Sequence, residues 1–216
     1  MLPTPQNAHL LVEGKNDLHV IKALCAYHRV PEAFDILEPI GASGVESLLQ
    51  QFRLKLREPD KHAVGIVVDA DTDLAHRWQL IRKIIQQHSA AYQTPSQPNA
   101  NGLVVPSPHE YLPRIGIWLM PDNQSSGDLE QFAAFLIPPT DPLRPYVRGI
   151  LEQLEAANLH RYRHKRSKAF IHTWLAWQEN PGQPIGTAIT AQALSANSPL
   201  AIRFIQWLNH LFNPKS

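Results

Sequence analysis

Acidic residues follow apolar segments at three places in this sequence, where they could act together. Glu13 follows the first apolar segment, Asp69 and Asp71 follow the third, and Asp122 follows the fourth. If these segments are neighbouring parallel strands, their carboxyl ends meet at one edge of the sheet and the acids converge there. Clustered carboxylates repel one another and favour a hard divalent cation with oxygen ligands. The pattern predicts a Mg²⁺ (or Mn²⁺) site suited to phosphoryl-transfer chemistry.

A simpler role is available to each of these acids taken alone. Asp and Glu are favoured at the N-termini of helices, so a single acid after a strand is most readily explained as a cap. Asp73, directly before the helix expected from Leu74, is the clearest such cap. Capping does not require an acid after three strands, however. Asp69 and Asp71 are also two residues apart, which in an extended strand end points both side chains the same way.

The apolar periodicity of the first half predicts strands that alternate with helices. Strands are expected at residues 8–12, 34–39, 63–68 and 114–120, with a short one at 103–105, and helices at about 16–30, 45–57 and 74–88. Asn16 is the expected cap of the first helix, and residues 41–44 form the expected turn before the second. This order predicts an α/β fold with three layers, in which helices flank a mostly parallel sheet.

From about residue 129 onward the pattern is helical. Helices are expected near residues 129–137, 143–158, 166–178 and 199–212. We therefore expect an α/β domain over residues 1–137 and a helical extension over residues 138–216, packed on the same domain. Phe170, Trp174 and Trp177 recur at helical spacing, which predicts that they face the core.

Composition limits the classes of function. The 216 residues carry a formal net charge of +1 and are 44% hydrophobic, with one cysteine, so we expect neither an intrachain disulfide nor a cysteine-based zinc site. The N-terminal residues lack the pattern of a signal peptide, and no apolar run approaches the roughly 18 residues that a membrane span needs. We therefore expect a cytoplasmic protein without a membrane partner.

A nearly neutral chain can bind nucleic acid only through a local basic patch. The densest patch lies at residues 160–168, where no acid interrupts the cations. We expect Arg161, Arg163, Lys165 and Arg166 to contact phosphates if the protein binds nucleic acid. A solvated helix start explains the same residues equally well.

Two strings resemble the motifs of the Toprim domain, the metal-binding α/β domain of topoisomerases, bacterial primases and the OLD-family nucleases. These strings are LLVEGKND and, two strand–helix units later, GIVVDADTD. The hallmark of Toprim is a Glu-Gly pair after the first strand and an Asp-x-Asp after the third. Here these positions are Glu13-Gly14 and Asp69-Ala70-Asp71. The resemblance extends over residues 8–137 and is closest to the OLD-family group and to a small stand-alone Toprim-like family.

The resemblance implies a role for each matching residue. Glu13 would be the general acid/base or a metal ligand, and Asp69 and Asp71 would hold Mg²⁺. Gly14 and Lys15 would bind a phosphate. Glu130 would be a further metal ligand, with Asp122 as the second candidate for that role. Lys168 would be a catalytic residue that stabilises developing charge. Asp17 would be a supporting partner or a first-turn helix acid.

The sequence departs from the OLD-family nucleases because it has no GxxxxGK[ST] loop, so the ATPase usually fused to them is missing. Two hypotheses follow. The first is a Mg²⁺-dependent nuclease that cleaves phosphodiesters in DNA or RNA. The second is a non-catalytic or partner-dependent module that binds nucleic acid or phosphate, in a phage-defence or DNA-repair system. A separate ATPase as partner and a homodimer both stay open. The acidic pair follows the third strand, which argues against haloacid-dehalogenase phosphatases and receiver domains.

Overall fold

The computed structural model describes residues 7–39 and 44–214, and these residues form five strands and eight helices. The strands are β1 (Ala8–Leu11), β2 (Asp35–Leu37), β3 (Ala63–Asp69), β4 (Leu103–Val105) and β5 (Arg114–Met120). The helices are α1 (Lys15–His28), α2 (Val45–Leu56), α3 (Leu74–His88), α4 (Leu129–Phe135), α5 (Leu143–Ala156), α6 (Arg166–Ala176), α7 (Ile185–Thr190) and α8 (Pro199–Phe212).

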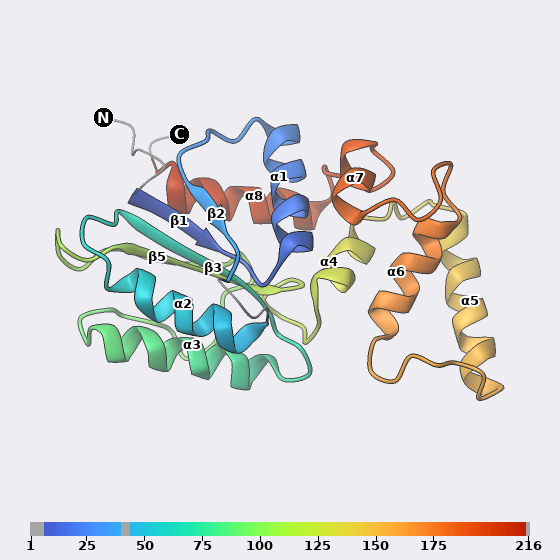
Figure 1. Cartoon of the computed structure of the whole chain (residues 1–216), viewed down its shortest axis with the longest axis horizontal. Coiled ribbons are helices and arrows are strands. Elements are labelled where there is room, and N and C mark those ends of the chain that lie inside the picture. Colours follow the sequence, from blue (N-terminus) through green and yellow to red (C-terminus); the bar gives the residue numbers. More distant parts are fainter. Residues whose placement is uncertain (1–6, 40–43, 215–216) are drawn as a thin grey trace.

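The strands form one sheet in the order β2-β1-β3-β5-β4. The first four strands of this order run parallel, and β4 is antiparallel to β5 at the far edge. Helices α1 and α8 cover one face of the sheet, and α2 and α3 cover the other (Figure 1). The predicted three-layer α/β fold is therefore confirmed.

The last helix is docked against two glycines at the centre of the sheet. Gly65 of β3 and Gly116 of β5 are paired in register. A Cβ atom at Gly116 would lie 2.2 Å from Cδ2 of Leu211, and one at Gly65 would lie 2.8 Å from the same atom. Only glycine leaves room for this contact, so α8 lies directly on the strands that lead to the acidic edge.

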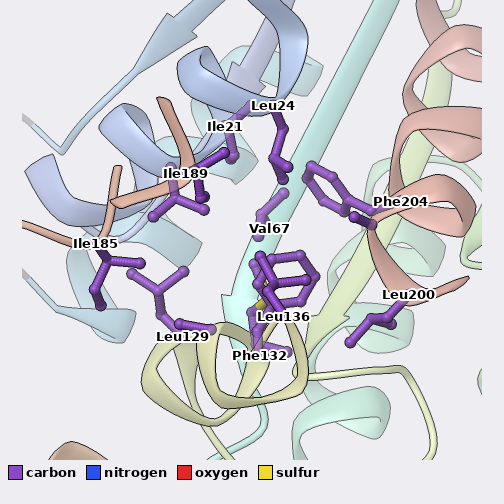
Figure 2. Packing of buried hydrophobic residues seen from close by; sticks show 14 of the residues in the cluster. Ile21, Leu24, Val67, Leu129, Phe132, Leu136, Ile185, Ile189, Leu200 and Phe204 are labelled. Carbon is purple, nitrogen blue, oxygen red and sulfur yellow. The ribbon is translucent and has the colours of Figure 1, made fainter. Parts of the chain in front are cut away.

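Helix α4 is fixed at the carboxyl edge of the sheet by its apolar face. Leu129, Phe132 and Leu136 are buried in the core cluster that also contains Val67 of β3. Figure 2 shows this face of α4 meeting Val67, with Phe204 of α8 close by. Because this face is anchored, the polar residues at the start of α4 have a defined place beside the end of β3.

Several predicted boundaries need correction. Helix α1 begins at Lys15 with Gly14 as its N-cap, so the prediction that Asn16 caps it was wrong. Strand β2 is shorter than predicted, and the short helix α7 was not expected at all. The turn predicted at residues 41–44 falls largely outside the described residues.

The apolar stripe on α6 was predicted only in part. Phe170 and Trp174 are buried, but Trp177 is 42% exposed because it follows the last residue of the helix. The core cluster joins residues of β1 and β3 to residues of α5, α6 and α8. The division at residue 137 stays a prediction. None of the helices within residues 7–39 and 44–214 combines the length and the apolar character that crossing a bilayer requires.

Candidate functional site

The connections of the sheet diverge between β1 and β3, an arrangement that leaves a crevice at the carboxyl ends of the strands in open α/β sheets. After β1 the chain moves to β2 on one side, and it then returns past β1 to form β3 on the other side. Helices α1 and α2 consequently lie on opposite faces. In open α/β sheets ligands bind where the connections diverge in this way, outside the carboxyl ends of the strands.

Glu13 and Asp69 meet at this point. Glu13 lies two residues after the end of β1, and Asp69 is the last residue of β3. The side-chain Oε1 of Glu13 accepts a hydrogen bond from the backbone N–H of Asp69 at 2.8 Å. The predicted convergence of the first and third strand ends is therefore present in the structure.

Asp69 lies within a group of acidic side chains. Its Oδ1 accepts the N–H of Leu129, the first residue of α4, at 3.0 Å. Burial is the main reason that its pKa rises to about 9, and the negative charges of neighbouring acids raise it further. These neighbours, with Asp69 itself, are called the acidic cluster below: Glu13, Asp17, Asp69, Asp128 and Glu130.

Asp17 belongs to the cluster through helix α1. It is only 8% exposed and stands third in the helix, from where its carboxylate accepts the N–H of the N-cap residue Gly14. This is the return half of a capping box. Burial raises the pKa of Asp17 to about 7, and the charges of Glu13 and Glu130 add to the effect. The acid caps its helix and also increases the negative charge of the site.

Nearby cations partly offset the charge of Glu13. Burial raises its pKa, and the charge of Asp71 acts in the same direction. The hydrogen bond from Asp69 and the charges of Arg77 and Lys165 oppose that rise. A carboxyl group with a raised pKa at the crevice is suited to exchanging a proton with a ligand bound there.

Asp128 and Glu130 enter the cluster from the start of α4. Asp128 is the N-cap of that helix: its Oδ1 accepts the N–H of Gln131, and its Oδ2 accepts the hydroxyl of Ser167 at 2.7 Å. Glu130, whose side chain is 12% exposed, lies 3.3 Å from the Nζ of Lys168. The start of α6 thus lies against the acidic cluster.

Asp71 is held at the rim. Its backbone adopts a left-handed conformation with φ 52°, and its N–H donates to the carbonyl of Gly127 at 2.8 Å. Its Oδ2 accepts a hydrogen bond from Nη2 of Arg77 at 2.5 Å. The left-handed residue ends the extended strand, so the assumption that Asp69 and Asp71 point the same way does not apply.

The other predicted site residues lie in different surroundings. Asp122 uses its carboxylate within its own turn, where Oδ1 accepts the N–H groups of Gln124 and Ser125. Asp73 caps α3 by accepting the N–H of His76, which confirms its predicted role. Lys15 is exposed at the start of α1 beside Gly14.

Gly14 borders open space. A Cβ atom at this position would meet no described atom within 4 Å. The backbone is therefore open to a ligand on that side, as phosphate binding requires. The adjacent exposed Lys15 supplies a positive charge at the same place.

The cations predicted to bind nucleic acid lie in the linker between α5 and α6 and at the first residue of α6. We call α5, this linker and α6 the basic arm (residues 143–176). Figure 1 shows these two helices beyond the carboxyl edge of the sheet, on the far side of α4. Arg166 donates to Oε1 of Glu155 at 2.7 Å, and the hydroxyl of Tyr162 donates to the same oxygen. Arg161 and Arg163 are exposed, while Lys165 is near enough to Glu13 to lower its pKa.

Comparison with known proteins places the chain in a family. A family model described as "Protein of unknown function (DUF3226)" matches residues 7–213. The chain belongs to the DUF3226 family. No curated protein and no solved structure matches it. The match spans both the sheet and the helices that follow it, so the acidic cluster and the basic arm of this DUF3226 chain belong to one family unit.

Two residues of this site, Asp128 and Arg77, were not identified as functional from the sequence. Asp128 and Gln131 have the spacing of a helix N-terminus, which predicts a cap but not contact with the end of β3. Asp17 lies in the first turn of its helix, where the sequence alone does not distinguish a capping acid from a supporting residue of the site. No sequence pattern marks Arg77 as a functional residue, because an isolated arginine early in a helix is ordinarily solvated.

The donor set of this DUF3226 chain fits a hard divalent cation. The acidic cluster offers carboxylate oxygens, which are the ligands that Mg²⁺ and Mn²⁺ prefer. The pKa of Asp69 is raised mainly by burial and further by the negative charges of its neighbours, and a bound cation would offset those charges. As the side chains lie, no three His, Cys, Asp or Glu residues in the described ranges are grouped to hold a metal ion.

Proposed function

We propose that this chain is a Toprim-like phosphodiester hydrolase that depends on a divalent metal and acts on DNA or RNA. The observation that carries the proposal is the contact between Glu13 and Asp69 at the crevice between β1 and β3, within a cluster of buried acids. Capping alone does not explain this cluster. Helix α4 is capped by Asp128, yet Asp69 also lies at its start.

In this proposal Glu13, Asp69, Asp71 and Glu130 would hold the metal. A bound Mg²⁺ would supply Lewis-acid polarisation of a phosphate oxygen and would offset the charge that develops during cleavage. Glu13, with its raised pKa, would accept or return a proton close to the scissile bond.

The chain's cations would position the substrate. The open side of Gly14 and the exposed Lys15 leave room for one phosphate group beside Glu13. Lys165 lies within electrostatic reach of Glu13, so a strand held by the basic arm would lead to the acidic cluster. Arg161 and Arg163 are the exposed members that would contact further phosphates.

A cleavage assay tests the proposal. The purified chain is incubated with supercoiled plasmid, linear DNA and structured RNA, with Mg²⁺ or Mn²⁺ and with chelator. We expect metal-dependent cleavage that falls at least about 10³-fold in Glu13→Gln, because loss of a metal ligand or proton acceptor removes several kcal/mol of transition-state stabilisation. Asp60→Asn, an exposed acid before β3 at the opposite end of the sheet, is the matched control and should cleave like the wild type.

A second candidate is a partner-dependent module that binds metal and phosphate without cleaving alone. One observation favours it: Asp71 and Glu130 are already paired with cations of the chain, so the carboxylates are not freely available. Metal binding in calorimetry without cleavage of any substrate would support this module. Equal cleavage by the wild type and Glu13→Gln would instead point to a contaminating nuclease and refute the first proposal.

A further inference from the structure

Two cations of the chain occupy carboxylates that the proposed metal site needs. Nη2 of Arg77 lies 2.5 Å from Oδ2 of Asp71, and Nζ of Lys168 lies 3.3 Å from Oε1 of Glu130. A divalent cation that binds either carboxylate must compete with the ammonium or guanidinium group already there.

The two pairs differ in which partner is held. The Arg77 side chain is 11% exposed and that of Asp71 is 57% exposed, so here the cation is fixed and the acid lies at the rim. In the second pair Glu130 is 12% exposed and Lys168 is 48% exposed, so the acid is fixed and the cation can swing away. One pair can open by movement of the acid and the other by movement of the cation.

Arg77 also has unused capacity to bind. Its Nε is buried and has no hydrogen-bond partner among the described residues. A guanidinium group with one nitrogen paired and another unpaired can accept a second anion in the forked geometry that suits phosphate. Arg77 is close enough to Glu13 to lower its pKa, so a phosphate bound there would lie beside the acidic cluster.

We propose that Arg77 and Lys168 are internal counterions that make divalent metal and nucleic-acid phosphate bind cooperatively. The inference rests on the proposed function. A phosphate competes with Asp71 for the fixed Arg77 and draws the mobile Lys168 away from Glu130, so both carboxylates lose the competitors of the metal. A metal draws the mobile Asp71 away from Arg77 and competes with Lys168 for the fixed Glu130, so both cations become free for phosphate. Coupling between two binding sites is reciprocal, so each ligand must strengthen the other by the same factor.

The experiment measures this factor in the full chain. Mn²⁺ is titrated calorimetrically with and without a short phosphorothioate-linked oligothymidylate, which resists cleavage. Affinity for the labelled oligonucleotide is measured by anisotropy with and without Mn²⁺. We expect each ligand to tighten the other by about 10-fold, within the usual range for coupled sites.

Arg77→Gln and Lys168→Gln test the residues. Each variant should bind Mn²⁺ alone more tightly than the wild type, because a competitor is gone, and each should show a smaller coupling factor. Lys168 is half exposed, so its variant should fold even if Arg77→Gln does not. Lys83→Gln is the matched control: it removes an exposed cation of α3 that is paired with neither Asp71 nor Glu130 among the described residues, so it should keep the coupling.

The outcomes separate this inference from the proposed function. If Mn²⁺ binds the wild type equally well with and without the oligonucleotide, the counterion role is wrong while the metal site stands. Weaker Mn²⁺ binding by both variants would also overturn it, because the cations would then position the carboxylates rather than compete. If the wild type binds no Mn²⁺ under either condition, the proposed function itself fails.

Discussion

The acidic cluster and the basic arm handle charge in opposite ways. The cluster gathers five acids at the end of a sheet, Asp17 buried and the others half-buried, and burial together with the neighbouring charges raises the pKa of Asp69 to about 9. The basic arm carries seven Lys and Arg residues against two Glu, and all of these side chains are exposed or only half-buried. Surface charges of this kind cost little stability, whereas buried like charges cost a great deal.

This difference explains why the net charge says little about the protein. Outside the basic arm the chain has 13 Lys and Arg against 17 Asp and Glu. The basic arm therefore has a net charge of about +5, and the rest of the chain has one of about −4. The two regions meet where Ser167 contacts Asp128 and Lys168 contacts Glu130. A nearly neutral chain can therefore place a cation-binding and an anion-binding surface side by side, as a metal-dependent phosphodiester hydrolase requires.

The largest expected effect comes from Asp69→Asn, which should lower activity and raise stability. Cleavage should fall at least about 10³-fold, because the variant loses a metal ligand. The folded-state pKa of Asp69 lies above its ordinary value of 3.8, so the folded chain binds the extra proton and loses stability as the pH rises from about 4 to about 9. Asparagine can still accept the N–H of Leu129, so Tm should rise by several degrees at pH 8 and by less at pH 5. A lower Tm at pH 8 would show that the buried charge is already compensated.

The second effect concerns the basic arm and should leave stability unchanged. Arg161→Gln/Arg163→Gln should weaken binding to nucleic acid about 10-fold and lower the slope of log affinity against log salt by about 2, because two phosphate contacts are lost. Anisotropy at several salt concentrations measures both quantities. Lys83→Gln, an exposed cation on α3, is the control and should change neither. An unchanged salt slope in the double variant would mean that the linker is merely solvated.

The sequence predicted the sheet well because its strands are strongly marked. β3 and β5 are apolar along nearly their whole length, and the buried helical faces, such as that of Trp78, Ile81 and Ile85, recur at the period of a helix. Helix α7 was missed because six residues span less than two turns and give no measurable periodicity. The N-cap of helix α1 was placed two residues late, at Asn16 instead of Gly14, because glycine as an N-cap leaves no side-chain signal.

The site was predictable only as far as the strands determine it. Glu13 and Asp69 follow neighbouring strands, so their convergence follows from sheet topology. Asp128 joins them because α4 is anchored in the core by contacts distant in sequence, and no local pattern reveals this. Asp71 shows the opposite error: spacing of two suggested a shared direction, but its left-handed backbone turned the side chain toward Arg77.

The smallest expected effect separates structural from functional acids within the cluster. Asp17 caps α1 through the N–H of Gly14, and asparagine can make the same hydrogen bond. Its pKa of about 7 lies above the ordinary 3.8, so the folded chain loses stability between about pH 4 and pH 7 and no further above that range. Asp17→Asn should therefore raise Tm at pH 8 by about 2–4 °C, the shift that 1 kcal/mol gives in a domain of this size. Saturating Mg²⁺ should reduce this rise in Tm, because a metal bound at Glu13 and Asp69 offsets the same negative charge. The metal also stabilises the wild type in proportion to the occupancy of the metal site. A gain that is unchanged by Mg²⁺ would place Asp17 outside the electrostatic reach of the metal and leave it the role of a helix cap alone.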